Sequence, residues 1–404
     1  MKLAFVVQRY GADIAGGSEA HCRELAHRLS RRLDPHGRPA FEITVLTTCA
    51  RDYVTWANAY PAGESQDDGV RVIRFAVARP RDLKTFADLS DEVFDGAAHA
   101  RQVEWFRVNG PDSPALLDHL SAAGSTYDLV LFWTFRYATS YFGLPRVADR
   151  AILVPTAEDD PAVHLEVLGD FFQQPAGYVF LTPEEETLVS MRAGRRLTPS
   201  TTIGIGLESV SSPPSIEQVR AAGIDGDYVL YLGRVDRNKG CHTMLEYFTA
   251  YADAGNAPTL VLAGPAKLQI PSHPKVRALG YVSNALREAL LAHASALIVP
   301  SRYESLSIVL LETWNHGVPA LVNAECKVLD GQVRRASGGL SYRSSAEFHE
   351  SLDFLMTQRA VREQLGRQGL AYVDREYRWP TVLARVEGLL NEVLEKRARS
   401  HRAG

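Results

Sequence analysis

The sequence predicts an α/β protein with two parallel-sheet domains in series. Three observations support this fold class. Short, uninterrupted apolar runs alternate with amphipathic segments, a proline- and serine-rich stretch interrupts the alternation once, and the chain has 404 residues. Uninterrupted apolar runs are typical of strands buried on both faces of a parallel sheet. One core rarely grows past about 250–300 residues, so we expect two Rossmann-like domains, each doubly wound.

The first domain is expected to cover residues 1–206. Its first strand, 3–7, is followed by a glycine-containing loop and then by a helical pattern that we expect Ser18 to cap. Apolar positions in that helix recur at three and four residues, and a second strand follows. Strand, loop, helix and strand form a βαβ unit. The strands expected in this domain are 3–7, 43–47, 129–133, 151–155 and 178–181.

The two domains are expected to meet at a linker, residues 207–215. This stretch holds two prolines and four serines, which do not suit a central strand or helix. The second domain then covers residues 216–378, with strands at 228–232, 260–263, 296–299 and 320–322. A charged helix within 379–404 comes last. Ligands bind outside the carboxyl ends of such strands, so we expect the site in a cleft between the domains.

Composition excludes several classes of protein. Hydrophobic residues make up 46%, charged residues 23% and the net charge is -4, so no basic field exists to gather nucleic acid. No apolar run approaches the length of a membrane span. The four cysteines have no C-x2-C spacing and are expected to be free thiols in a reducing, cytoplasmic location: Cys22, Cys49, Cys241 and Cys326.

The segment 301–312, which follows the strand 296–299, is the strongest site signal. We expect Ser305 or Ser307 to cap the helix that starts here. Free N–H groups at a helix start favour an anion such as a diphosphate. Glu304 beside a diphosphate is useful only if it contacts sugar hydroxyls or stabilises positive charge on a sugar ring. Glu312 is placed to accept ribose hydroxyls. The alternative is that these are ordinary capping and surface residues.

Two other loops follow predicted strands. Segment 233–240 holds Arg234 and Lys239, which can neutralise charge on a leaving diphosphate; the alternative is a solvated basic turn. Gly16-Gly17-Ser18-Glu19 is not G-x-G-x-x-G, so a dinucleotide fingerprint is not supported. Its glycines allow close approach to the backbone, or form a plain tight turn.

These segments, taken together, resemble a retaining glycosyltransferase of family 4 with the GT-B fold. The resemblance covers nearly the whole chain. It rests on Gly16-Gly17-Ser18-Glu19, on Gly233-Arg234 with Lys239-Gly240, on Leu279-Gly280-Tyr281-Val282, on Glu304 and Glu312 in E-x7-E spacing, and on Gly317-Val318-Pro319. These motifs are specific for the family but not for a particular sugar.

The resemblance implies a role for each matching position. Arg234 and Lys239 would bind the donor diphosphate, and with Glu304, which would contact the transferred sugar, they are the catalytic candidates. Glu312 would bind the ribose. The remaining donor-binding positions are Leu306 and Ser307, by their backbone, Tyr281 and Val282 at the base, and Gly17 from the first domain. No cofactor or metal is expected, since the co-substrate is a nucleotide-diphosphate sugar. The last helix would cross back to the first domain.

The acceptor side departs from the family. Members often carry a histidine after the strand that here is 129–133, but this chain reads Trp133-Thr134-Phe135-Arg136-Tyr137. We name Arg136, Glu158 and Asp159 as acceptor-side candidates, because they follow the strands 129–133 and 151–155. For Glu158 and Asp159, a solvated loop is an equal alternative.

The expected reaction is transfer with retention to a saccharide or lipid-linked saccharide, in the synthesis of a cell-surface polysaccharide. Two alternatives remain open: a sugar-nucleotide epimerase of the same fold, and a non-catalytic sugar-nucleotide-binding protein. Peripheral contact with the membrane would use a basic run against anionic lipid, although a solvated helix end is the stronger interpretation. The run comprises Arg28, Arg31, Arg32, His36 and Arg38.

Overall fold

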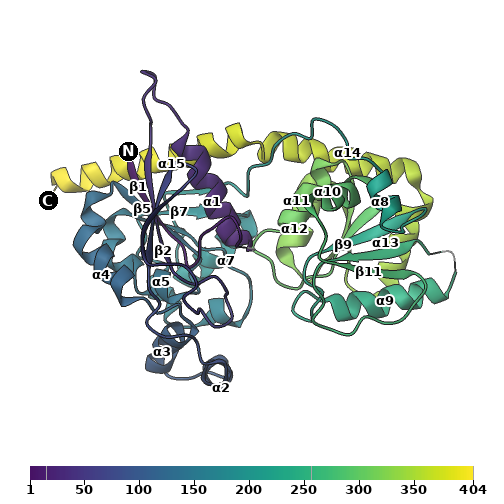
Figure 1. Ribbon diagram of the computed structural model, residues 1–404, viewed down its shortest axis with the longest axis horizontal. Coiled ribbons are helices and arrows are strands. Elements are labelled where there is room, and N and C mark those ends of the chain that lie inside the picture. Colours follow the sequence, from purple (N-terminus) through teal and green to yellow (C-terminus); the bar gives the residue numbers. More distant parts are fainter. Residues whose placement is uncertain (15, 256, 404) are drawn as a thin grey trace. The chain divides into compact units, whose positions relative to one another are not determined.

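The computed structural model describes residues 1–14, 16–255 and 257–403, and it contains two compact units (Figure 1). Unit 1 is Met1–Gly204 with Leu383–Gly404, and unit 2 is Ile205–Val382. Each unit contains one sheet whose strands are mostly or wholly parallel. The prediction of two Rossmann-like α/β domains is therefore confirmed.

The sheet of unit 1 has eight strands in the order β3-β4-β2-β1-β5-β6-β7-β8. Only the β3–β4 pair is antiparallel. The five predicted strands all occur, with ends shifted by at most one residue. The strands are β1 Lys2–Val6, β2 Glu42–Thr48, β3 Gly63–Asp67, β4 Val70–Phe75, β5 Leu129–Trp133, β6 Ala151–Val154, β7 Gly177–Phe180 and β8 Ser200–Thr202.

The helices of unit 1 pack a large aromatic and aliphatic core against this sheet. Phe132 on β5 and Phe180 on β7 belong to one cluster with Trp105, Phe106 and Phe171 from the helices. The helices are α1 Gly17–Ser30, α2 Leu83–Phe94, α3 His99–Asn109, α4 Pro114–Ala123, α5 Ala138–Tyr141, α6 Leu168–Phe171 and α7 Pro183–Ala193, with short turns η1 Gly124–Thr126, η2 Leu144–Arg150 and η3 Pro161–His164.

The start of α1 differs from the prediction. Gly16, not Ser18, occupies the cap position, and no side chain caps the helix. Ser18 already lies within α1, and its hydroxyl donates 2.9 Å to Glu19 Oε2. The predicted Ser18 cap is therefore wrong, because the helix begins one residue before Ser18 and Gly16 occupies the cap position.

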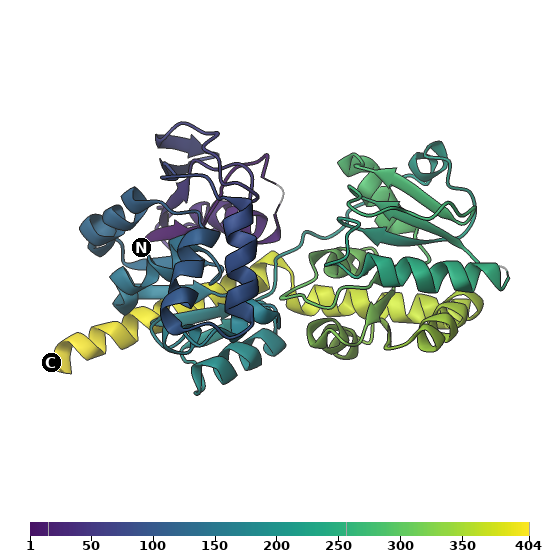
Figure 2. The ribbon, with the colours of Figure 1, turned by 90° about the horizontal axis from the view of Figure 1, so that it is seen from below.

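The final helix, α15 (Trp379–Ala403), leaves unit 2 and packs on unit 1 (Figure 2). Arg32 pairs with Glu387 at 2.6 Å. Arg397 pairs with Asp149 at 3.0 Å. Gly177 on β7 has no room for a Cβ, which would lie 2.6 Å from Val393 Cγ2. The C-terminal helix thus returns to the first domain, as expected.

The sheet of unit 2 has six strands in the order β11-β10-β9-β12-β13-β14, all paired in parallel. Its strands are β9 Tyr228–Leu232, β10 Thr259–Ala263, β11 Val276–Gly280, β12 Ala296–Val299, β13 Ala320–Asn323 and β14 Gly339–Tyr342. Its helices are α8 Glu217–Ala221, α9 Cys241–Asp253, α10 Asn284–His293, α11 Ile308–Asn315, α12 Lys327–Ala336, α13 Ser345–Thr357 and α14 Arg359–Glu376. The four predicted strands are the inner ones, whereas β11 and β14 at the edges were missed.

The stretch predicted as a linker, 207–215, lies within unit 2. The Leu207 amide donates 2.7 Å to the carbonyl of Tyr377, and Leu207 forms a parallel bridge with Arg378. The chain passes between units after Gly204 and again after Val382. All four cysteines are buried free thiols. In the described part of the chain, no helix is long and apolar enough to cross a bilayer.

Candidate active site

The loops that follow β9 and β12 meet at one edge of the second sheet, because these two strands are parallel neighbours. This edge carries a direct contact between two predicted site residues. Lys239 Nζ, after β9, donates a 2.8 Å hydrogen bond to Glu304 Oε1, after β12. The Glu304 side chain is 12% exposed and that of Lys239 30%. The ammonium group therefore offsets the repulsion that an isolated carboxylate would exert on a bound diphosphate.

A tight turn brings Lys239 to Glu304. Gly240 has a φ of 73°, and a Cβ there would lie 2.2 Å from the carbonyl oxygen of Pro300. Only glycine permits both the left-handed backbone and this approach between the two loops. Asp236 Oδ1 accepts from the Lys239 amide at 2.8 Å, which closes the turn.

Arg234 lies beside the same carboxylate. One of its terminal nitrogens is 3.5 Å from Asp236 Oδ2. The Arg234 carbonyl accepts a 2.6 Å hydrogen bond from the Tyr231 hydroxyl, which fixes the start of the loop. Asp236 thus contacts both predicted phosphate-binding residues. Our sequence reasoning missed it, although it stands between them in the same segment.

The helix start after Glu304 is formed by α11. Ser307 holds the cap position, but its side chain makes no capping hydrogen bond. The prediction that the Ser307 hydroxyl caps this helix is therefore wrong, and Ser305 lies before the cap position. Leu306 and Ser307 are buried, at 8% and 3% exposure, so only their backbone is suited to meet an anion.

Glu312 lies on α11 and pairs with Arg287 of α10. Arg287 also contacts Glu288 at 2.7 Å, and Glu288 contacts His316 at 3.0 Å. Burial raises the pKa of Glu312, and the guanidinium of Arg287 opposes that rise. A ribose at Glu312 would therefore meet a carboxylate already held by a cation. Nothing in the sequence pattern pointed to Arg287.

Tyr281 and Val282 follow the edge strand β11. Gly280 ends that strand with a φ of 66°. The Tyr281 side chain is 86% exposed, so its ring face is open to stacking, while Val282 is half-buried. Their assignment to the nucleotide base remains a prediction.

In unit 1, the predicted glycine motif surrounds a buried ion pair. Glu19 Oε1 lies 2.5 Å from Arg9 and accepts 2.8 Å from the Gln8 amide. A Cβ on Gly16 would lie 2.2 Å from Glu19 Oε2. The missing side chain at Gly16 therefore makes room for the Glu19 carboxylate rather than for a ligand. Gly17 is the first residue of α1, and its approach to donor remains a prediction.

The acceptor-side candidates follow β5 and β6, which are neighbouring parallel strands. Arg136 pairs with Asp160, and Asp159 contacts His164 at 2.8 Å. Burial acts to lower the pKa of Arg136, but the carboxylates of Asp160 and Glu158 raise it overall. The structure thus brings Arg136 to the loop that contains Glu158 and Asp159.

Backbone strain marks both of these loops. Thr134 follows β5 with a φ of 58°, and Thr156 follows β6 with a φ of 48°. β-Branched residues rarely adopt this left-handed conformation, and such strain often occurs at ligand sites. The two threonines support a functional role for this edge of the first sheet.

A histidine does lie beside the end of β5, but α1 supplies it. The Trp133 indole donates 3.3 Å to His21 Nδ1. Burial lowers the His21 pKa to about 4, so the ring is neutral at pH 7. Sequence reasoning looked only after the strand and missed this contact between elements 112 residues apart.

Residues 215–371 match the family model "Glycosyl transferases group 1". This region holds Arg234, Lys239, Glu304 and Glu312, and it covers most of unit 2. The second unit is thus similar to glycosyl transferases group 1 domains over residues 215–371.

Similar proteins extend over nearly the whole chain. Glycogen synthase from Mycobacterium tuberculosis is 22% identical over 414 aligned positions, covering 95% of this chain and 92% of that protein. Sucrose-phosphate synthase from Thermosynechococcus elongatus has a TM-score of 0.70 at 16% identity, covering 98% of this chain and 99% of that one. HepE from Anabaena, solved with UDP and glucose, has a TM-score of 0.68 at 15% identity, covering 97% and 100%. These solved structures share the fold of this chain over both of its units.

Proposed function

We propose that this protein is a retaining, metal-independent glycosyltransferase. It moves a hexose from a nucleotide-diphosphate donor to a saccharide or lipid-linked saccharide, in cell-surface polysaccharide synthesis in the cytoplasm. The observation that carries the proposal is the 2.8 Å contact between Lys239 and Glu304 at the edge of the second sheet, within the region that matches the group 1 model. UDP is the first donor nucleotide to test, because HepE was solved with it.

The proposed chemistry needs no nucleophile from the protein. The bond between the anomeric carbon and the diphosphate oxygen breaks while the acceptor oxygen bonds to the same face of that carbon. The acceptor proton passes to the leaving phosphate oxygen. Arg234, Lys239 and the start of α11 would stabilise the charge that develops on the diphosphate. Glu304 would face the positive charge that develops on the sugar ring.

The surroundings of Glu304 favour this division of roles. The carboxylate is mostly buried and faces the Lys239 ammonium, so it repels a diphosphate less strongly than a lone carboxylate would. When the donor binds, Lys239 is placed to turn from Glu304 to a phosphate oxygen. Glu304 would then interact more strongly with the transition state than with the bound donor, which is what a catalytic group requires.

The basic run from Arg28 to Arg38, at the end of α1 and in the loop after it, favours a solvated surface rather than a lipid-binding one. Four of its arginines lie within 4.0 Å of carboxylates: Arg28 with Glu24, Arg31 with Asp68, Arg32 with Glu387 and Arg38 with Asp34. Their charges are already locally balanced. We therefore expect this run to attract a lipid-linked acceptor only weakly.

A donor panel tests the proposal. Purified protein is titrated with UDP-, GDP-, ADP- and dTDP-glucose in a thermal-shift assay, and a donor that binds the native state raises the melting temperature. The stabilising donor is then incubated with glucose and oligosaccharide acceptors, and the anomeric configuration of the product is read by NMR. We expect transfer with retention. An inverted product would refute the retaining mechanism. An isomerised donor formed without acceptor would instead indicate an epimerase.

A further inference from the structure

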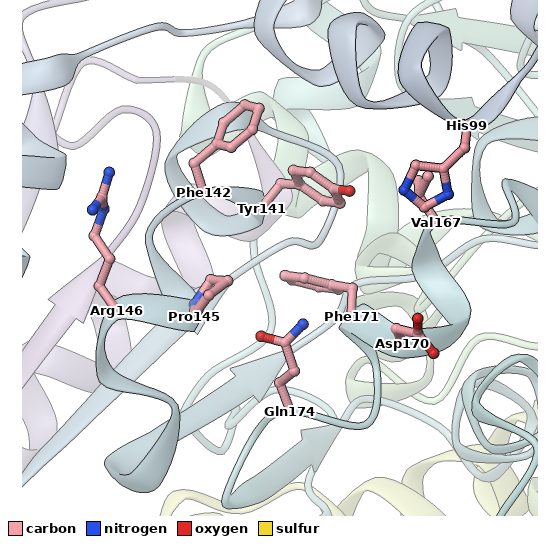
Figure 3. A pocket seen from close by; sticks show the side chains of 9 residues that line it. All are labelled: His99, Tyr141, Phe142, Pro145, Arg146, Val167, Asp170, Phe171 and Gln174. Carbon is pink, nitrogen blue, oxygen red and sulfur yellow. The ribbon is translucent and has the colours of Figure 1, made fainter.

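Unit 1 contains a cavity of about 460 Å³ that none of the predicted site residues lines (Figure 3). Its walls come from α3, α5, α6 and η2. The rings of Tyr141 and Phe171 lie in the middle, with His99 and Asp170 to one side and Gln174 below them in the view. This volume falls in the range of small-molecule sites.

The floor of the cavity is a rigid aromatic stack. Tyr141 stacks on the fully buried Phe106 with ring centroids 3.9 Å apart and an interplanar angle of 6°. Phe171 stacks on Tyr141 at 5.4 Å, and Phe142 meets Tyr141 edge-on at 5.0 Å. Phe106 and Phe171 are buried, so the half-buried rings of Tyr141 and Phe142 supply the aromatic contact area, and their packing limits the conformational entropy lost on binding. Such a floor suits the C–H surface of a sugar ring.

The rim of the cavity is polar and keeps its hydrogen-bonding capacity. Within the described residues, the side chains of His99, Asp170 and Gln174 and the Tyr141 hydroxyl make no hydrogen bond to the protein. A carboxylate, an amide, an imidazole and a phenol together both donate and accept. Arg146 and Asp170 give the lining opposite charges. This combination suits a neutral ligand rich in hydroxyl groups better than an anion.

The residues that line the cavity lie close in the sequence to the acceptor-side candidates. Helix α5, Ala138–Tyr141, starts two residues after Arg136 and ends at the aromatic floor. Its four residues span about 6 Å. A second connection leads from Glu158 and Asp159 through η3, Pro161–His164, to α6. Short stretches of chain therefore connect the acceptor-side candidates to the cavity, which makes the cavity the place to test for binding of further sugar units.

We propose that this cavity binds a neutral saccharide chain, namely the part of the acceptor beyond the reacting sugar. This inference rests on the proposed function, and it narrows the acceptor to an oligosaccharide or longer chain. A second saccharide contact lowers the concentration of acceptor needed for half-maximal rate as the chain lengthens, without changing the donor site.

Calorimetric titration tests the proposal directly. The probes are glucose and three glucotetraoses, with α-1,4, β-1,3 and β-1,4 linkages. The variant is Asp170→Asn with Gln174→Ala, which alters exposed side chains only. Tyr141→Phe, which removes the hydroxyl but keeps the stack, is the second variant. Glu166→Gln, exposed on the same segment but outside this cavity, is the matched control.

We expect at least one tetrasaccharide to bind more tightly than glucose. The double variant should weaken that binding about 10-fold or more, as expected for lost hydrogen bonds that include a charged acceptor, and the control should not. If no tetrasaccharide binds the wild-type protein, or if the double variant binds as well as the wild type, the proposal is overturned.

Titration with UDP, GDP, ADP and dTDP in parallel separates this inference from the proposed function. Nucleotide binding and sugar transfer without binding at the cavity would overturn only the cavity. Saccharide binding that depends on Asp170 and Gln174, but without transfer from any sugar nucleotide, would leave the cavity standing and overturn the proposed function.

Discussion

Lys239 donates a 2.8 Å hydrogen bond to Glu304, although 65 residues separate them in the chain. The pair places a cation and a carboxylate at the same point of the second sheet's edge. In the proposed reaction the diphosphate gains negative charge, which Lys239 offsets. The sugar ring gains positive charge at the same time, which Glu304 offsets. The first prediction separates those two roles.

Glu304→Gln should lower kcat about 100-fold or more, because the lost charge acts mainly in the transition state. Binding of free nucleoside diphosphate should stay within about twofold of wild type, since the Gln side chain still reaches Lys239. Steady-state kinetics and calorimetry measure the two effects. Loss of nucleotide binding with unchanged kcat would show that Glu304 is not the sugar contact.

Glu312→Ala should weaken nucleoside diphosphate binding by about 1–3 kcal/mol, because a charged acceptor for the ribose is lost. Glu288→Ala is the matched control, since Glu288 also contacts Arg287 but is not assigned to the ribose. Calorimetry with the free nucleotide compares them. Equal weakening by both variants would mean that Glu312 acts only by holding Arg287.

Transfer activity should persist in EDTA. Arg234, Lys239 and the α11 start can balance the diphosphate charge without a cation. Initial rates are compared in EDTA, in buffer, and after adding excess Mg²⁺ or Mn²⁺. A rate that vanishes in EDTA and returns with either metal would contradict the metal-independent mechanism.

Glu19→Ala should destabilise the protein by about 3–5 kcal/mol, because it leaves the buried Arg9 guanidinium without its carboxylate. The two side chains are only 5% and 7% exposed. Glu24→Ala is the control on the same helix: its partner Arg28 is 4.0 Å away and the two side chains are 44% and 31% exposed, so about 0.5 kcal/mol or less is expected. Urea unfolding followed by tryptophan fluorescence measures both. Similar midpoints for the two variants would refute the prediction.

Glu185 should make stability depend on pH. Burial raises its pKa from 4.5 to about 8, although the amides of Leu181, Ala157 and Thr182 oppose the rise. The folded state therefore holds a proton that the unfolded state loses above pH 4.5, so this stability is present at low pH and is lost as the pH rises towards 8. The slope is at most about 1.4 kcal/mol per pH unit.

Glu185→Gln should flatten that decline between pH 5 and 8, as measured by unfolding at several pH values. Glu186→Gln is the control, because Glu186 is the next residue on α7 and contacts the hydroxyls of Ser200 and Thr202. An unchanged pH dependence in Glu185→Gln would show that the carboxyl does not titrate in this range.

The sequence by itself determined the two α/β domains and most of their inner strands, although it missed β4, which lies between β3 and β2. Segments such as 129–133 and 296–299 are apolar throughout because both faces of the strand are covered, and that requirement is visible in the residues. The edge strands β3 and β11 carry polar residues and glycine, because one side of an edge strand is open to solvent. Hydrophobicity alone therefore did not reveal them.

The sequence also predicted Arg234, Lys239, Glu304 and Glu312 as site residues, because the loops after β9 and β12 and the helix start that follows β12 suit an anion. Only the tertiary structure decided their partners. Which loops meet depends on strand order and register, and these bring together residues far apart in the chain. Thus Lys239 meets Glu304, Arg287 meets Glu312, Asp160 meets Arg136, and His21 meets Trp133, at separations of 65, 25, 24 and 112 residues. No local pattern encodes such pairings, because hydrogen bonds between side chains form only after the sheets have set their strands side by side.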